Sequence, residues 1–247
     1  MKPQKKRVRM FAGPNGSGKS TVKHEISPNL IGMYVNPDDI ERSIREHGFL
    51  DLKDYEIGTS DSEILSFFTD SSFLKSVGLV AEAEKLRCFE GKLWLHKAAM
   101  NAYFASVLSD FIRRKLLDTG KSFSFETVMS SADKVEFLQT AQGMGYRTYL
   151  YFVATEDPKV NLVRVQQRVE KGGHDVPEDK VIARYHRSLA LLPEAIRYTN
   201  RAYLLDNTVK LRLILEVTEG KEVEMQTSDV PEWCRKALHE TFAAAGN

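Results

Sequence analysis

Cysteine is scarce in this chain of 247 residues, which contains only Cys88 and Cys234. The two lie far apart, and neither sits in a Cys-x-x-Cys or Cys/His ligand spacing. No histidine pair forms H-x-x-x-H or H-E-x-x-H either. The pattern therefore supports neither a disulfide framework nor a structural zinc site, and we interpret both thiols as buried or incidental.

An excess of one charge and long apolar runs are also missing. The formal net charge is +1, so the chain has no broad basic field, and we do not expect nucleic acid as a partner. No apolar run reaches the roughly 18 residues that would cross a bilayer. The basic cluster before residue 10 is not followed by a signal-like apolar segment. We therefore expect a soluble, cytoplasmic protein without a membrane partner.

Linker-like segments are absent as well. Pro, Gly and Ser gather only in short stretches that are typical of local turns, so we predict one domain over 1–247. Residues 51–119 have helical spacing and are predicted to form a helical insertion. Residues 209–247 are predicted to form a hairpin followed by a helix.

The most informative feature that is present is a glycine-rich motif near the start. It matches G-x-x-x-x-G-K-[ST] and follows an apolar strand at 8–12, and its residues are Gly13, Pro14, Asn15, Gly16, Ser17, Gly18, Lys19, Ser20 and Thr21. In such a loop, backbone N–H groups and the lysine hold the phosphates of a nucleotide, and the Ser20 hydroxyl can bind Mg²⁺. The motif predicts a site for ATP and Mg²⁺.

Strand and helix patterns alternate on both sides of the insertion. Strands are expected at 33–35, 122–125, 147–153 and 202–205, with helices between them. Repeated strand-helix units after a phosphate loop predict an α/β fold, a P-loop three-layer sandwich with a mainly parallel sheet.

Polar residues follow the expected strands at the edge where ligands bind in parallel sheets. Asn36, Asp38 and Asp39 follow the second strand, and Glu126 and Thr127 follow the third. Asp38 and Asp39 are candidates for the general base that takes a proton from an acceptor hydroxyl, and one of them is expected to cap the next helix. Glu126 is expected to contact substrate or the Mg²⁺ shell. A second metal ligand is not predicted.

Two arginine-bearing helices flank the turn Gly172-Gly173-His174-Asp175-Val176-Pro177. Arg164 and Arg168 precede the turn, and Arg184 and Arg187 follow it. Such a pair of helices can form a lid that brings arginines over a phosphate, and Arg168 is the first choice for this role. His174 is either a turn residue or a lid donor to phosphate.

Four pieces in this order and spacing resemble the zeta-toxin-like P-loop kinases: residues 11–21, 35–39 and 125–127, and the segment from Arg168 to Pro177. The resemblance implies an ATP-dependent kinase that phosphorylates a hydroxyl of UDP-N-acetylglucosamine and is silenced by an antitoxin. It implies that Asp38 is the general base, that Glu126 and Thr127 contact the substrate, and that Arg168 is a lid arginine. It also implies a second lid arginine, whose place here falls near His174.

Other hypotheses fit the same motifs. A nucleoside, antibiotic or polynucleotide-end kinase would share these parts. A regulatory module that binds a nucleotide, or a simple NTPase without a phosphoryl acceptor, would need the phosphate loop alone.

Overall fold

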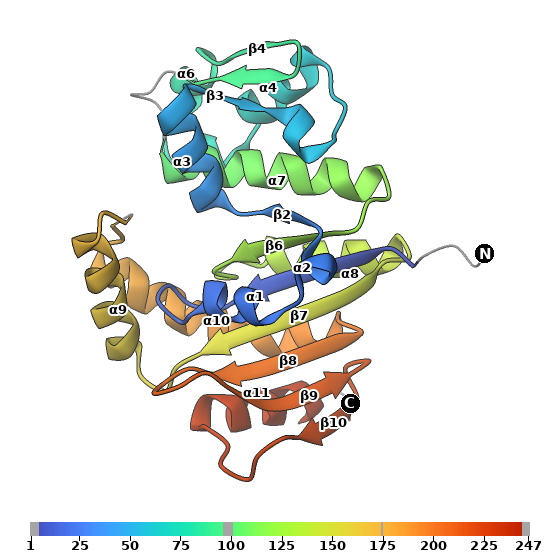
Figure 1. Cartoon of the computed structure of the whole chain (residues 1–247), viewed down its shortest axis with the longest axis vertical. Coiled ribbons are helices and arrows are strands. Elements are labelled where there is room, and N and C mark those ends of the chain that lie inside the picture. Colours follow the sequence, from blue (N-terminus) through green and yellow to red (C-terminus); the bar gives the residue numbers. More distant parts are fainter. Residues whose placement is uncertain (1–4, 96–100, 174, 244–247) are drawn as a thin grey trace. The chain divides into compact units, whose positions relative to one another are not determined.

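A computed structural model describes residues 5–95, 101–173 and 175–243. The chain divides into two units, one formed by Met1–Gly32 with Phe123–Asn247 and the other by Met33–Ser122 (Figure 1). The sequence predicted an insertion at 51–119, whereas the second unit begins at Met33 and so includes the strand and helix before that block.

The first unit is built on a sheet in which the strands follow the order β10-β9-β8-β7-β1-β6. Pairs β1·β6, β1·β7 and β7·β8 are parallel, whereas β8·β9 and β9·β10 are antiparallel. The strands are β1 (Arg7–Ala12), β6 (Phe123–Thr127), β7 (Arg147–Ala154), β8 (Arg201–Asp206), β9 (Arg212–Thr218) and β10 (Glu222–Met225). This confirms the mainly parallel sheet and the C-terminal hairpin.

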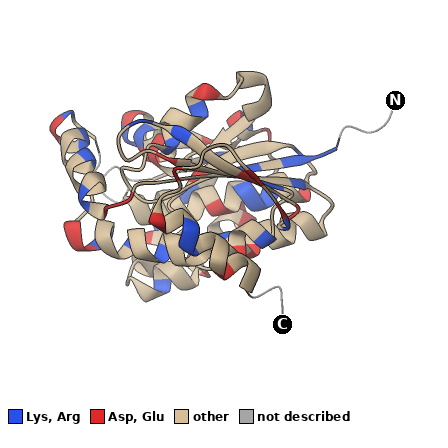
Figure 2. Cartoon of the chain, turned by 90° about the horizontal axis from the view of Figure 1, so that it is seen from below, with Lys and Arg blue, Asp and Glu red and all other residues tan. Residues whose placement is uncertain are grey.

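Helices cover both faces of this sheet, as Figure 1 shows for α1 on one face and for α10 and α11 on the other. They are α1 (Lys19–Glu25), α2 (Pro28–Ile31), α8 (Asp133–Gly143), α9 (Pro158–Glu170), α10 (Glu178–Arg197) and α11 (Glu232–Ala243). Apolar residues of β1 are fully buried between them, and the ring of Phe152 on β7 lies 6.0 Å from that of Trp233 on α11. Figure 2 shows basic and acidic residues mixed along the ribbon, as the net charge of +1 leads one to expect.

The register of the parallel strands brings their carboxyl ends to one edge. Ala12 pairs with Thr127 of β6, and Ala154 pairs with Asp206 of β8. The segments that follow β1, β6, β7 and β8 therefore leave the sheet side by side, where ligands bind in sheets of this kind.

The second unit is mainly helical, as predicted for residues 51–119, but it also contains a small sheet with the strand order β3-β5-β4. Its elements are β2 (Met33–Val35), α3 (Pro37–His47), β3 (Phe49–Asp51), a 3₁₀ helix (Leu52–Tyr55), α4 (Asp61–Thr69), α5 (Ser72–Ser76), α6 (Val80–Ala83), β4 (Arg87–Phe89), β5 (Lys92–Trp94) and α7 (Ala102–Asp118). Residues 51–119 were predicted to form a helical insertion without strands, and the strands β4 and β5 show that this prediction was wrong for 87–94. Glu90 and Gly91 both have positive φ, 52° and 80°, which is the backbone of a two-residue hairpin turn.

None of the helices in the described ranges is long and apolar enough to span a membrane.

Candidate active site

The glycine-rich motif forms the turn between β1 and α1 that the sequence predicted. Its three glycines, Gly13, Gly16 and Gly18, have φ of 141°, 73° and 100°, values that residues with a side chain rarely adopt. Space is also short, because a Cβ at Gly13 would lie 2.1 Å from the backbone oxygen of Val153 on β7. The glycines are therefore required by both backbone conformation and close packing against the neighbouring strand.

Lys19 is the first residue of α1 and is only 7% exposed. Its Nζ donates to the backbone oxygens of Gly13 and Pro14, at 3.0 Å each. The ammonium group is thus held inside the turn of the loop, where it can meet the phosphate oxygens of a nucleotide.

Glu126 lies beside this ammonium, with its Oε1 3.9 Å from Lys19 Nζ. The contact follows from the register, because Glu126 on β6 pairs with Phe11 on β1, just before the loop. The neighbouring Thr127 hydroxyl accepts a hydrogen bond from Met129 N at 3.0 Å and shapes the turn after β6. The structure therefore brings together Lys19 and Glu126, which lie far apart in the sequence.

Among the described residues, no group of three or more His, Cys, Asp or Glu side chains could hold a metal ion by itself. Mg²⁺ in kinases is bound by one or two protein oxygens together with substrate phosphates and water. The donors near the loop are the exposed Ser20 hydroxyl and the Glu126 carboxylate. This donor set fits Mg²⁺ that arrives with ATP.

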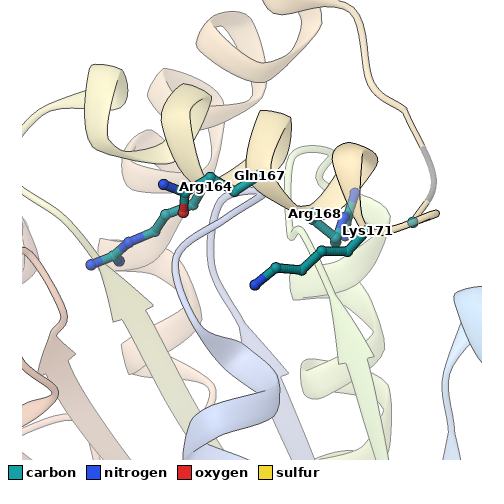
Figure 3. A pocket seen from close by; sticks show the side chains of 5 residues that line it. Arg164, Gln167, Arg168 and Lys171 are labelled. Atoms are coloured by element: carbon teal, nitrogen blue, oxygen red, sulfur yellow. The ribbon is translucent and has the colours of Figure 1, made fainter.

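Helix α9 presents a row of cations next to the loop. Arg164, Gln167, Arg168, Lys171 and Gly173 line a cavity of about 380 Å³. Figure 3 shows the side chains of Arg164 and Lys171 extending from the same side of α9, as their spacing of seven residues requires. The cavity brings Arg168, the predicted lid arginine, together with Lys171, which the sequence reasoning did not select.

The arginines of α9 have different surroundings. Arg164 donates to the backbone oxygens of Asn207 (2.7 Å) and Thr208 (3.2 Å), so its guanidinium group holds the segment after β8. The side chain of Arg168 packs against Gly173, where an added Cβ would lie 2.6 Å from Arg168 Cγ. Arg164 therefore stabilises the backbone after β8, and Arg168 and Lys171 are the better candidates to contact a ligand.

Asn36, Asp38 and Asp39 belong to the second unit. Asn36 caps α3, because its Oδ1 accepts from Asp38 N at 2.9 Å. The expectation that Asp38 or Asp39 caps this helix was wrong, since a residue that precedes the helix is better placed to reach its first N–H groups. Asp39 pairs with Arg42 at 2.6 Å on the exposed side of α3. The role of Asp38 as general base stays a prediction, and His174 lies outside the described residues.

A Gly13→Ala substitution is expected to lower the free energy of unfolding by about 2–4 kcal/mol, because it adds backbone strain to a clash with Val153. Urea unfolding measures the change. The matched control is Gly143→Ala at the end of α8, where an added Cβ meets nothing within 4 Å. The control should change stability by less than about 1 kcal/mol. Equal stabilities for the two variants would show that the loop is not packed as described.

Comparisons with known proteins agree with this geometry. Residues 95–211 match the family model for zeta toxin. A curated protein of Haemophilus influenzae, described as uncharacterized, is 32% identical over 63 residues, which is 26% of this chain and 45% of that protein. Crystal structures of AvrRxo1-ORF1:AvrRxo1-ORF2, one with sulphate ions and one with ATP, contain a chain with a TM-score of 0.57 and 15% identity. That match covers 95% of this chain and 64% of the solved chain.

Fold and loop together define an α/β protein of the P-loop class. The match of residues 95–211 to the zeta toxin family model agrees with the resemblance that the motifs predicted. The matched segment begins after the phosphate loop and contains Glu126, Thr127 and the helix α9. This chain spans about two-thirds of the solved AvrRxo1 chains and less than half of the curated relative.

Proposed function

We propose that this chain is a Mg·ATP-dependent phosphotransferase that transfers the γ-phosphoryl group of ATP to a hydroxyl of a small molecule. The observation that carries the proposal is the pair of Lys19, held inside the glycine loop, and Glu126, 3.9 Å from its ammonium group. A loop of this type binds the phosphates of the donor. A carboxylate at the same edge gives the site a second group that can reach Mg²⁺ or the acceptor.

The donor half of the proposed site consists of the loop residues 13–21. Lys19 would meet the β- and γ-phosphates, and the Ser20 hydroxyl and the Glu126 carboxylate are the oxygen donors that would hold Mg²⁺ or its bound water. When bound, the metal neutralises charge on the phosphate oxygens. An AvrRxo1 structure with ATP has the same fold, which supports ATP as the donor for this chain.

Asp38 is proposed as the general base for the acceptor. Asp38 takes the proton of the acceptor hydroxyl while the hydroxyl oxygen bonds to the γ-phosphorus. The bond between the γ-phosphorus and the oxygen that bridges it to the β-phosphate breaks, and ADP leaves. Asn36 holds Asp38 in the first turn of α3 through its cap, which leaves the carboxylate of Asp38 without a capping role. Asp39, Glu126 and Thr127 are proposed to contact the acceptor.

A lid over the phosphates is proposed from α9. Arg168 and Lys171 lie on the wall of the cavity beside the loop and are proposed to neutralise charge on the transferred phosphoryl group. This assigns to Lys171 the second lid cation that the resemblance placed near His174. ATP supply favours the cytoplasm as the place of the reaction.

The acceptor is proposed to be a UDP-N-acetyl sugar, as in the zeta-toxin family. To test this, the protein is incubated with Mg·ATP and UDP-N-acetylglucosamine, and the sugar nucleotide is followed by mass spectrometry. The expected product carries one additional phosphoryl group, and one molecule of it forms for each ADP. An unchanged sugar nucleotide, with transfer to other metabolites, would reject this acceptor and keep the kinase. ADP and inorganic phosphate as the sole products would indicate an NTPase.

The AvrRxo1-ORF1:AvrRxo1-ORF2 complex supports a protein partner of the antitoxin type for this chain. We propose that expression of the active chain arrests growth and that such a partner restores it. Normal growth of cells that contain active enzyme would contradict the toxin role.

A further inference from the structure

Two backbone carbonyls of the phosphate loop are held by side-chain amides from distant parts of the chain. Asn161 Nδ2 on α9 donates to the oxygen of Asn15 at 2.6 Å, and Asn207 Nδ2 after β8 donates to the oxygen of Ser17 at 2.8 Å. Within the described residues all peptide bonds are trans. In a trans peptide the C=O and the following N–H point in opposite directions.

The two amides therefore fix the direction of two N–H groups. When Asn161 holds the oxygen of Asn15, the N–H of Gly16 must point away from α9. When Asn207 holds the oxygen of Ser17, the N–H of Gly18 must point away from the segment after β8. Backbone N–H groups aimed to one side of a loop are the donors that bind phosphate oxygens.

Both amides are themselves held in place. Asn161 is fully buried, and its Oδ1 accepts from the Thr155 hydroxyl, while Tyr185 on α10 donates to the Thr155 carbonyl at 2.6 Å. Asn207 is held through its carbonyl by Arg164 at 2.7 Å. The glycines match this arrangement, because a Cβ at Gly16 would lie 2.6 Å from Asn161 O, and one at Gly18 would lie 2.2 Å from Asn207 Nδ2.

We propose that Asn161 and Asn207 are positioning residues of the phosphate site, which orient the Gly16 and Gly18 peptides so that their N–H groups face the triphosphate of the nucleotide. This inference rests on the proposed function of the loop. Neither residue needs to touch the ligand. Their effect is to present the two N–H groups without a cost of reorganisation when the phosphates bind.

The test measures the affinity of the full chain for Mg·ATP and for inorganic triphosphate by calorimetry. Asn207→Leu and Asn161→Leu keep a side chain of similar shape and add no charge, but they remove the donor. Each variant is expected to lower the affinity for both ligands by about tenfold, the typical effect of a lost hydrogen bond to a partly buried carbonyl. Inorganic triphosphate has no base or sugar. A loss of triphosphate affinity in a variant, relative to wild type, therefore reports on the phosphate contacts alone. Because Asn161 is fully buried, the half-buried Asn207 gives the more tractable variant.

The matched control is Asn200→Leu. Asn200 also bonds backbone through its side chain, accepting from Thr148 N at 2.8 Å, but it lies before the amino end of β8. It should lower the thermal unfolding midpoint and leave triphosphate affinity unchanged. If wild type binds triphosphate and the Asn207 variant binds it equally well, the positioning role is wrong, and it is also wrong if Asn200→Leu weakens binding as much. If wild type binds neither ligand, the proposed function fails together with this inference.

Discussion

Lys19→Ala is expected to lower kcat/KM for phosphoryl transfer by about 10³-fold, the upper range for losing one preorganised charge at a transition state. The Lys19 side chain is 7% exposed, and its ammonium group donates to the carbonyls of Gly13 and Pro14, so it is in place before a nucleotide binds. No neighbouring cation on α1 can replace it, because Lys23 lies one turn further along the helix. Steady-state kinetics with labelled ATP measures the effect.

Lys23→Ala is the control for this variant, since it removes the same charge from the same helix. It is expected to retain activity within a few-fold of wild type. The two proteins should have similar thermal unfolding midpoints if the loss is chemical. Full activity of Lys19→Ala would show that Lys19 of the loop has no role in phosphoryl transfer.

Asp38→Asn is expected to lower kcat by about 10²–10⁴-fold while the affinity for Mg·ATP stays unchanged, because a general base acts on the acceptor and not on the donor. The amide has nearly the same shape as the carboxylate but cannot take the proton. Asn36 caps α3 through the backbone N–H of Asp38, so the substitution should leave the helix intact. Single-turnover kinetics together with calorimetry separates the two quantities.

The control for this second variant is Asp70→Asn, at the C-terminal end of α4 in the same unit, with a side chain that is 81% exposed. It is expected to be as active as wild type. Equal kcat values for Asp38→Asn and wild type would show that another group takes the proton. A loss of ATP affinity in Asp38→Asn would show that the carboxylate serves the donor half.

The sheet and the loop could be predicted because their signals are local. A strand, a glycine-rich turn and a helix follow one another over 7–25, and strand periodicity marks the later units. The place of Glu126 at the same edge as the loop was predicted from the parallel sheet, since strand ends of such a sheet share one edge, but its contact with Lys19 was not.

Other features depend on contacts that sequence patterns do not show. Asn161 and Asn207 lie 146 and 190 residues from the loop carbonyls that they hold. Asn161 lies within a helix pattern and Asn207 follows a strand pattern, and neither pattern indicates the partner. The hairpin at 87–94 was hidden because its strands have three residues each, too few to show alternation. Its signal was the Glu90-Gly91 pair between Phe89 and Lys92.

The place of Lys171 beside the arginines of α9 could have been predicted from sequence. Its spacing from Arg164 and Arg168 is that of one helix face, and Gly172 ends the helix directly after it. The structure also distinguishes Arg164 from Arg168, because the guanidinium group of Arg164 donates to the backbone carbonyls of Asn207 and Thr208.

The most direct test of the central claim follows the γ-phosphoryl group itself. The full chain is incubated with γ-labelled ATP, Mg²⁺ and a metabolite extract, and the label is traced by chromatography. We expect the label in an organic acceptor, in amounts equal to the ADP formed, and none in that acceptor with Lys19→Ala. Label that remains in ATP, or that appears only as inorganic phosphate, would contradict a phosphotransferase.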